Sequence, residues 1–184
     1  MSSILKVGEL QDPTNGNTAL TIDSAGNIKN SGAVVQVQQT ATTTLSVVST
    51  DSFTAVGLDV NITPKFADSK ILITVCGCFG HTQDTYGGAR LFRGSTAIGR
   101  GDDAGNRTGY SFAINERSVD APWEAYMASY TFLDSPATTS QITYSLKLAK
   151  LYGTSITCNK SYNDVDAAYG WRTMSTITAQ EIAQ

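Results

Sequence analysis

The 184-residue sequence carries little charge, and that charge is scattered along the chain. Charged residues make up 16% of it, with 16 acidic and 13 basic side chains and a formal net charge of −3. Proteins that bind nucleic acid electrostatically concentrate Lys and Arg in a patch or stripe, and this sequence has no such stripe. The composition therefore argues against a nucleic-acid partner.

Signals for export or membrane insertion are also missing. Met1-Ser2-Ser3 leads into an alternating segment rather than into a basic stretch followed by an apolar core. No apolar run approaches the roughly 20 residues that a membrane-spanning helix needs. We expect a soluble product of the cytosol without a membrane partner.

Residues suited to catalysis are scarce. His81 is the single histidine, and no serine lies in a Gly-x-Ser-x-Gly turn. The close acidic pairs are Asp102 with Asp103 and Asp164 with Asp166. Such pairs could serve a lectin-like or glycoside-hydrolysing module, or could bind Ca²⁺, and these alternatives stay open. The favoured interpretation is a protein without catalytic residues, cofactor or metal.

Cysteine is rare, and the three cysteines cannot all pair with one another. Cys76 and Cys78 lie two residues apart, on one face of an expected strand, and Cys158 lies far along the chain. We expect reduced, buried thiols. A disulfide or a metal site is the alternative, and a metal would need a fourth ligand.

The first thirty residues have strand and turn signals but few apolar side chains to bury. An isolated hairpin is marginal in water, so this segment needs the body of the chain, a symmetry mate or a larger assembly to fold on. We therefore predict an N-terminal attachment arm at residues 1–32, in extended or hairpin form, and a body at residues 33–184. The expected anchoring residues are Ile4, Leu5, Val7, Leu10, Leu20, Ile22 and Ile28.

In the body, a period of two dominates, and helical periodicity is almost absent. The expected strands cover residues 35–38, 54–62, 70–79, 89–93, 95–99, 123–133, 141–151 and 174–182. About eight strands without helices predict an all-β, antiparallel β-sandwich, with a jelly-roll-like topology preferred. A turn is expected at Arg93-Gly94, and Ile142, Tyr144, Leu146 and Leu148 should share the buried face of their strand.

Three long segments lack clear strand signals: residues 80–88, 99–122 and 159–171. Loops of this length inside a compact domain are usually functional or held by a partner. Their aromatic residues are candidates for a receptor or interface contact: Tyr86, Tyr110, Tyr162, Tyr169 and Trp171. The alternative is that these rings pack the loops onto the sandwich. Core positions are expected instead for Phe53, Phe66, Phe79, Phe92, Phe132 and Tyr144.

Several blocks of the sequence resemble virion structural proteins of tailed bacteriophages, notably those that infect cyanobacteria and marine bacteria. In the body these blocks are residues 70–73, 89–99 with Gly101-Asp102 and Arg107-Thr108, 132–136 and 175–182. Residues 4–7 with 20–26 are similar to a module that begins many phage fibre and decoration proteins. The resemblance implies a β-sandwich that assembles as a trimer, binds the virion by one end and carries no catalytic residues.

The expected edge strands also favour assembly, because the near-neutral, Thr-rich sequence lacks the lysines that protect the sheet edges of many monomers from pairing. Subunit contacts would cover these edges, and a homotrimer closes by symmetry. The resulting hypothesis is a non-enzymatic virion protein, made in the host cytoplasm, that serves as a capsid decoration (cement) protein or a short fibre. Its partners would be further copies of itself and capsid or tail proteins. The alternative is the host-recognition tip of a tail fibre, which binds cell-surface glycan.

Overall fold

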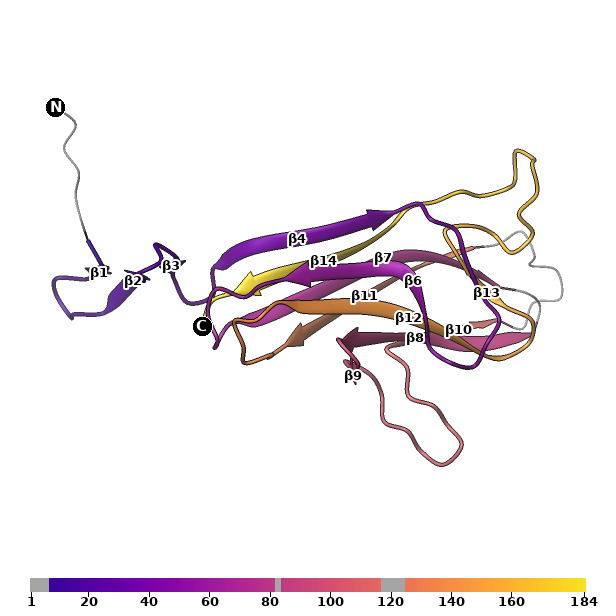
Figure 1. The fold of residues 1–184 in the computed structure, drawn as a ribbon, viewed down its shortest axis with the longest axis horizontal. Helices are drawn as coiled ribbons and strands as arrows, with labels where there is room; N and C mark the ends of the chain where they lie inside the picture. The colour runs from indigo at the N-terminus through magenta and orange to yellow at the C-terminus, as the bar shows by residue number, and fades with distance from the viewer. Residues whose placement is uncertain (1–6, 82–83, 117–124) are drawn as a thin grey trace.

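The computed structural model of the chain describes residues 7–81, 84–116 and 125–184, and all its regular secondary structure is β-strand (Figure 1). The strands are β1 (Glu9–Gln11), β2 (Thr18–Ile22), β3 (Ile28–Lys29), β4 (Val34–Thr42), β5 (Ser46–Val48), β6 (Thr54–Ile62), β7 (Lys70–His81), β8 (Thr85–Arg93), β9 (Thr96–Ile98), β10 (Phe112–Glu116), β11 (Tyr126–Asp134), β12 (Ile142–Tyr152), β13 (Ile156–Cys158) and β14 (Ser175–Ile182). The described residues include no helix long and apolar enough to cross a membrane.

The body is an antiparallel β-sandwich with jelly-roll topology, as the sequence predicts. One sheet has the order β10-β8-β12-β6, with β9 also pairing with β8. The other has the order β4-β14-β7-β13-β5, with β11 on the opposite side of β7. Among the eight long body strands, the first, eighth, third and sixth in the chain (β4, β14, β7 and β11) are neighbours in one sheet. The fifth, fourth, seventh and second (β10, β8, β12 and β6) form the other sheet, which is the jelly-roll order.

Alternating side chains of the two sheets build the core between them. In β6, buried and exposed residues alternate from Val56 to Ile62. In β7, Ile71, Ile73 and Val75 are buried. The predicted apolar face of β12 is confirmed, since Ile142, Tyr144, Leu146 and Leu148 are all buried. This is the pattern that a pleated strand produces when one of its faces is covered.

Two predicted loops are wrong in part. Within residues 80–88, positions 80–81 and 85–88 are strand, because β7 runs on to His81, which is buried, and β8 begins at Thr85. Residues 99–122 contain β10, and β5 and β13 were not predicted. The glycines in 80–88 indicate a loop in sequence, but here they allow close packing: a Cβ at Gly88 would lie 2.7 Å from the Tyr110 ring.

Phe79 and Tyr144 lie in the core as expected, but Phe53 and Phe92 do not. Their rings pack edge to face, 5.9 Å apart, and the guanidinium of Arg90 lies over the Phe53 ring. The ammonium of Lys147 lies over the Phe92 ring, 4.6 Å from its centre. These two aromatic residues therefore form a small cluster on the outer face of the β10-β8-β12-β6 sheet, stabilised by cation–π contacts.

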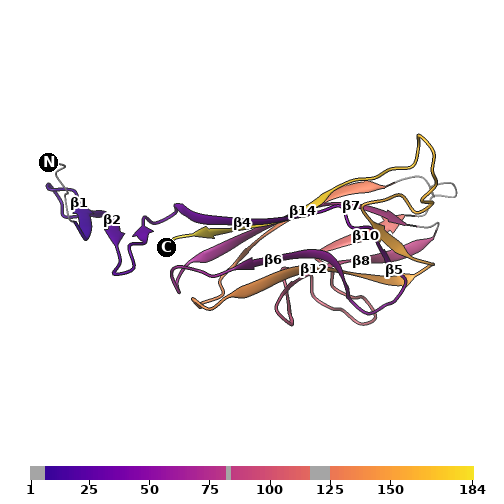
Figure 2. The ribbon, with the colours of Figure 1, turned by 45° about the horizontal axis from the view of Figure 1, so that its top comes forward.

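The N-terminal residues form a separate three-stranded antiparallel sheet, β1-β2-β3, which extends beyond one end of the sandwich (Figures 1 and 2). The arm contacts the body at its last strand and in the residues that follow this strand. Lys29 forms an ion pair with Asp68 at 2.5 Å, and its ammonium lies 5.5 Å from the centre of the Phe66 ring. The N–H of Gly32 donates to the carbonyl of Ala183 at 2.8 Å.

Close to these contacts between the arm and the body, the buried carboxylate of Glu181 holds the loop that carries Phe66. It accepts hydrogen bonds from the side chain of Gln36 (2.5 Å) and from the backbone N–H groups of Lys65 (2.8 Å) and Phe66 (3.1 Å). Burial raises the pKa of Glu181, but these hydrogen bonds more than offset that effect and leave the pKa below its ordinary value of 4.5.

Glu181 should make the stability of the body depend on pH. Because its pKa is lower in the folded chain, its contribution is complete above about pH 4.5 and is lost as the pH falls through the folded pKa. We expect Glu181→Gln to lower the melting temperature at pH 7, since an amide N–H would then face N–H donors. The gap to the wild type should narrow towards pH 3. Thermal unfolding of both proteins at several pH values measures this, and a gap that is constant with pH would contradict it.

Candidate binding surfaces

The arm sheet has one apolar face. Leu10 on β1 is opposite Leu20 on β2, and Ile22 on β2 is opposite Ile28 on β3, so all four side chains lie on the same side of the sheet. Leu10 and Ile28 are 54% and 56% exposed, Val7 is also exposed, and Leu20 and Ile22 are half-buried. The predicted anchoring residues Ile4 and Leu5 lie outside the described residues.

Hydrogen bonds in the hairpin turn fix the shape of this arm sheet. Asp23 accepts hydrogen bonds from the N–H groups of Ala25 (2.9 Å) and Asn27 (2.8 Å) and from the Asn27 side-chain amide (2.9 Å). Aspartate commonly organises turns in this way. The β2–β3 connection is therefore ordered by local bonds, and it presents Ile22 and Ile28 together.

At the end of the sandwich away from the arm, Asn159 fixes the base of a long loop, residues 159–174 (Figure 1). Asn159 is fully buried with a positive φ of 65°. Its amide donates to the carbonyls of Thr42 and Thr44, both at 3.0 Å, and its side-chain oxygen accepts from the Ser175 hydroxyl at 2.6 Å. One side chain thus links the loop to the end of β4 and to the start of β14.

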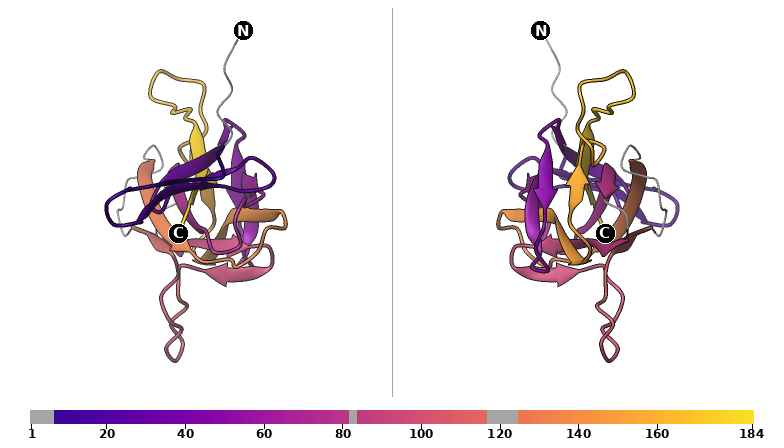
Figure 3. Two further views of the ribbon diagram at one scale, coloured as in Figure 1. Left: turned by 90° about the vertical axis from the view of Figure 1, so that its left-hand side faces the viewer. Right: turned by 90° about the vertical axis from the view of Figure 1, so that its right-hand side faces the viewer.

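Ion pairs also hold the neck of this loop. Lys160 and Arg172 face each other in an isolated β-bridge, and the Asp164 carboxylate binds both, at 3.4 Å and 2.6 Å. The loop projects from the sandwich on the side opposite the loop after β9 (Figure 3). Beyond its neck it exposes Tyr169 (55%) and Trp171, while Tyr162 is half-buried.

Two of the aromatic residues predicted to be exposed in loops, Tyr86 and Tyr110, are located differently in the structure. Tyr86 lies on β8 rather than in a loop, and its ring centre is 5.8 Å from that of Tyr152 at the end of β12. Tyr110 is half-buried, and its ring lies 5.9 Å from Phe53. Packing onto the sandwich is therefore what Tyr110 does in this structure.

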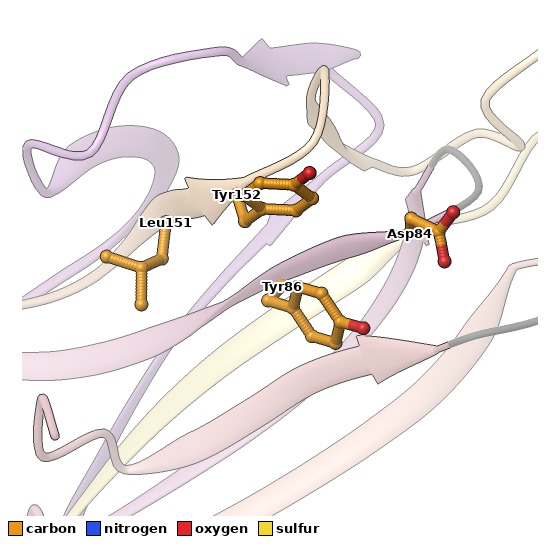
Figure 4. A pocket seen from close by; sticks show the side chains of 4 residues that line it. All are labelled: Asp84, Tyr86, Leu151 and Tyr152. Carbon is orange, nitrogen blue, oxygen red and sulfur yellow. The ribbon is translucent and has the colours of Figure 1, made fainter.

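Tyr86 and Tyr152 line a shallow pocket of about 620 Å³ together with Asp84 and Leu151 (Figure 4). Tyr152 is 63% exposed, and Leu151 beside it is exposed as well. The start of β8 and the end of β12, which carry three of the pocket residues, lie at the same end of the sandwich as the 159–174 loop, away from the arm (Figure 1). No motif in the sequence marks Tyr152, Leu151 or Asp84 as binding residues.

One aspartate of each acidic pair fastens a loop. Asp103 accepts the N–H of Gly109 at 2.7 Å and pairs with Arg90 at 3.1 Å and Arg100 at 2.9 Å. The hydrogen bond from Gly109 and the two arginines hold the pKa of Asp103 below its usual value. Asp164 ties the neck of the other loop, as described above. Within the described residues, no group of three His, Cys, Asp or Glu side chains is placed to hold a metal ion.

All three cysteines are unpaired. Cys78 and Cys158 are buried, and Cys76 is half-buried. Burial raises the pKa of the Cys158 thiol to about 11, so this thiol is protonated at neutral pH and is a poor nucleophile.

The outer face of the sheet formed by β4, β14, β7 and β11 carries no charged side chain over three rows of paired residues. Lys70 lies at its border, and Glu181 and Asp134 point to the inner side. We call this surface the charge-free face. The twelve residues of these rows are Val37, Gln39, Ala41, Leu72, Thr74, Cys76, Ser129, Thr131, Leu133, Thr176, Thr178 and Gln180, and Met127 continues the face in the next row, opposite Cys78.

The other sheet provides a comparison within the same molecule. Its outer face carries Asp59 on β6, Arg90 on β8 and Lys147 on β12, and Arg90 pairs directly with Lys147 across the strands. Exposed sheet faces of monomers are normally polar and charged, whereas the centres of interfaces are depleted of charge. The outer face with Asp59, Arg90 and Lys147 therefore has the composition of a surface exposed to solvent, whereas the charge-free face has the composition of an interface.

No protein-family model matches the chain, and no curated protein matches its sequence. Among solved structures, it is similar to a chain in a structure titled "Structure of infectious bursal disease virus Gx strain", with 12% sequence identity and a TM-score of 0.35. The match covers 97% of this chain and 42% of that chain, so this chain spans less than half the length of the protein that it matches.

Proposed function

We propose that this chain is a non-enzymatic structural protein of a virus particle, a homotrimer that its N-terminal arm fastens to the particle as a decoration protein or short fibre. The observation that carries the proposal is the arm sheet. Its apolar face of Leu10, Leu20, Ile22 and Ile28 extends beyond the sandwich, with Leu10 and Ile28 more than half exposed. Burial of these side chains against a neighbouring protein would be favourable by about 25 cal/mol for each Å² of apolar surface.

The layout of the molecule also supports attachment by one end. The arm lies at one end of the long axis of the sandwich, and the 159–174 loop lies at the other (Figures 1 and 2). A protein held by its arm would therefore present this loop outward. The resemblance of residues 4–7 and 20–26 to the opening of phage fibre and decoration proteins agrees with this orientation.

The charge-free face supports contacts between copies of the chain. Both edge strands of its sheet, β4 and β11, lack lysine, and their outward residues include Val37, Met127 and Leu133, all exposed. A surface without charge has its best partner in another surface without charge, and a second copy of the chain supplies one. Packing of copies through this face would also cover the unguarded edges.

The test of the proposed function is whether the arm is needed for incorporation into particles. Leu10→Asp with Ile28→Asp places two carboxylates on the apolar face, and we expect at least a tenfold lower copy number in purified particles by quantitative mass spectrometry. Deletion of residues 1–30 should have the same effect and leave the body folded.

The control variant is Ser24→Asp with Ala25→Asp, which adds the same charge in the exposed turn between β2 and β3 and should incorporate normally. If the Leu10/Ile28 variant is incorporated as well as this control, the arm is not the anchor and the proposal fails.

A second candidate function is host recognition by the end away from the arm. The exposed Tyr152, Tyr169 and Trp171 at this end favour it, because aromatic rings are frequent anchors in binding sites. It requires that the purified protein bind host cells and block infection. A protein present in many copies on the shell, without binding to cells, would contradict this candidate.

A further inference from the structure

Three local departures from regular β-structure meet at the pocket of Tyr86 and Tyr152. The pairing of β12 with β8 shifts register between Lys150 and Tyr152, where Leu151 is the additional residue. Such bulges re-aim side chains and are frequent next to binding sites. Here the bulge places Tyr152 opposite Tyr86, with their ring planes inclined by 43°.

Two residues next to the bulge, Gly153 and Asp84, have a positive φ. Gly153 has a φ of +81°, and a Cβ at this position would lie 2.7 Å from the Cα of Thr85 and 2.8 Å from the carbonyl oxygen of Asp84. Asp84 itself has a φ of 51°, which few residues other than glycine adopt. Residues other than glycine that have a positive φ are frequent at binding and catalytic sites. Asp84 and the two tyrosines are thus held together by Gly153 and the bulge.

We infer that this pocket binds the ring of a neutral sugar. Leu151 lies at one end, and the two phenol oxygens point towards the end where Asp84 lies (Figure 4). The C–H face of a pyranose ring would stack on the exposed ring of Tyr152, and neighbouring hydroxyls would donate to the Asp84 carboxylate. Aromatic faces and a charge-assisted acceptor recognise these two parts of a sugar.

The charges at the pocket limit the ligand class. Asp84 is the charged residue among the four that line it, and none of the four is basic, so an acidic sugar would be repelled. A quaternary ammonium group is a different ligand for aromatic rings beside a carboxylate, but it needs rings that surround it. Two tilted rings in a shallow pocket favour the flat face of a sugar.

The test is saturation-transfer NMR on the full-length protein with the methyl glycosides of glucose, galactose, mannose and N-acetylglucosamine. Each glycoside is present at about 10 mM, because we expect a single sugar site to have a dissociation constant on the order of 1 mM. We expect saturation transfer to at least one of the four. Tyr152→Ala should weaken its binding about tenfold. Asp84→Asn should also weaken it and keep the fold, because asparagine tolerates a positive φ.

Tyr169→Ala is the matched control, since Tyr169 is 55% exposed on the neighbouring loop and does not line the pocket. This variant should bind the glycoside as tightly as the wild type does. No transfer to any of the four glycosides, unchanged binding by Tyr152→Ala, or binding of choline alone would each overturn the inference. The inference rests on the host-recognition candidate only for the source of the sugar. A protein that binds a free glycoside but not host cells would retain the site and overturn that candidate.

Discussion

Replacement of Asn159 by alanine is expected to lower the free energy of unfolding by about 4 kcal/mol, a large part of the stability of a typical domain. The side chain makes three hydrogen bonds, to Thr42, Thr44 and Ser175, and loss of these should cost about 3 kcal/mol. Alanine at a φ of 65° adds about 1 kcal/mol of backbone strain. Urea denaturation of the purified variant measures the change.

Asn159→Gly separates the two contributions, because glycine adopts a positive φ without strain. It should lose only the hydrogen-bond part, about 3 kcal/mol. Ala137→Gly is the control for the backbone: Ala137 has a φ of 52° in an exposed turn, so glycine there should stabilise the protein slightly. Equal stabilities of the Asn159→Ala variant and the wild type would mean that the loop base does not depend on this residue.

The strands that the sequence predicts well are those whose two faces differ. Thr54–Ile62 alternates from Val56 onward, and in Ile142–Tyr152 the residues Ile142, Tyr144, Leu146 and Leu148 share the buried face that covers the core. Glycine obscured the start of β8, because Gly87 and Gly88 indicate a loop in sequence but serve close approach between strands in the fold. Local patterns cannot separate these two roles of glycine.

The binding surfaces could be predicted far less well, because they depend on which strands become neighbours. Tyr86 and Tyr152 are distant in the sequence and meet only through the pairing of β8 with β12. The alternation of Thr176, Thr178 and Gln180 is visible in the sequence, but the charge-free face appears only when β14 lies between β4 and β7. Sheet order, and not residue type, was the missing information.

A single charge on the charge-free face is expected to separate the copies of the chain. Thr131 is exposed on β11, next to Thr74 on β7, so glutamate at this position can remain solvated in a monomer. In a trimer that packs through this face, each copy would bury one carboxylate without a partner, which costs several kcal/mol. Sedimentation of Thr131→Glu should therefore give the 19.5 kDa monomer, whereas the wild type should sediment at about three times this mass.

Two control variants show whether charge at this face, rather than mutation alone, separates the copies. Thr131→Gln has nearly the shape of the glutamate variant without its charge and should stay trimeric. Ala55→Glu puts the same charge on an exposed position of β6, in the sheet whose outer face already carries Asp59, Arg90 and Lys147, and should also stay trimeric. If Thr131→Glu sediments like these two controls, copies do not meet through this face, and the outer surface of the β4-β14-β7-β11 sheet must owe its lack of charge to a different partner.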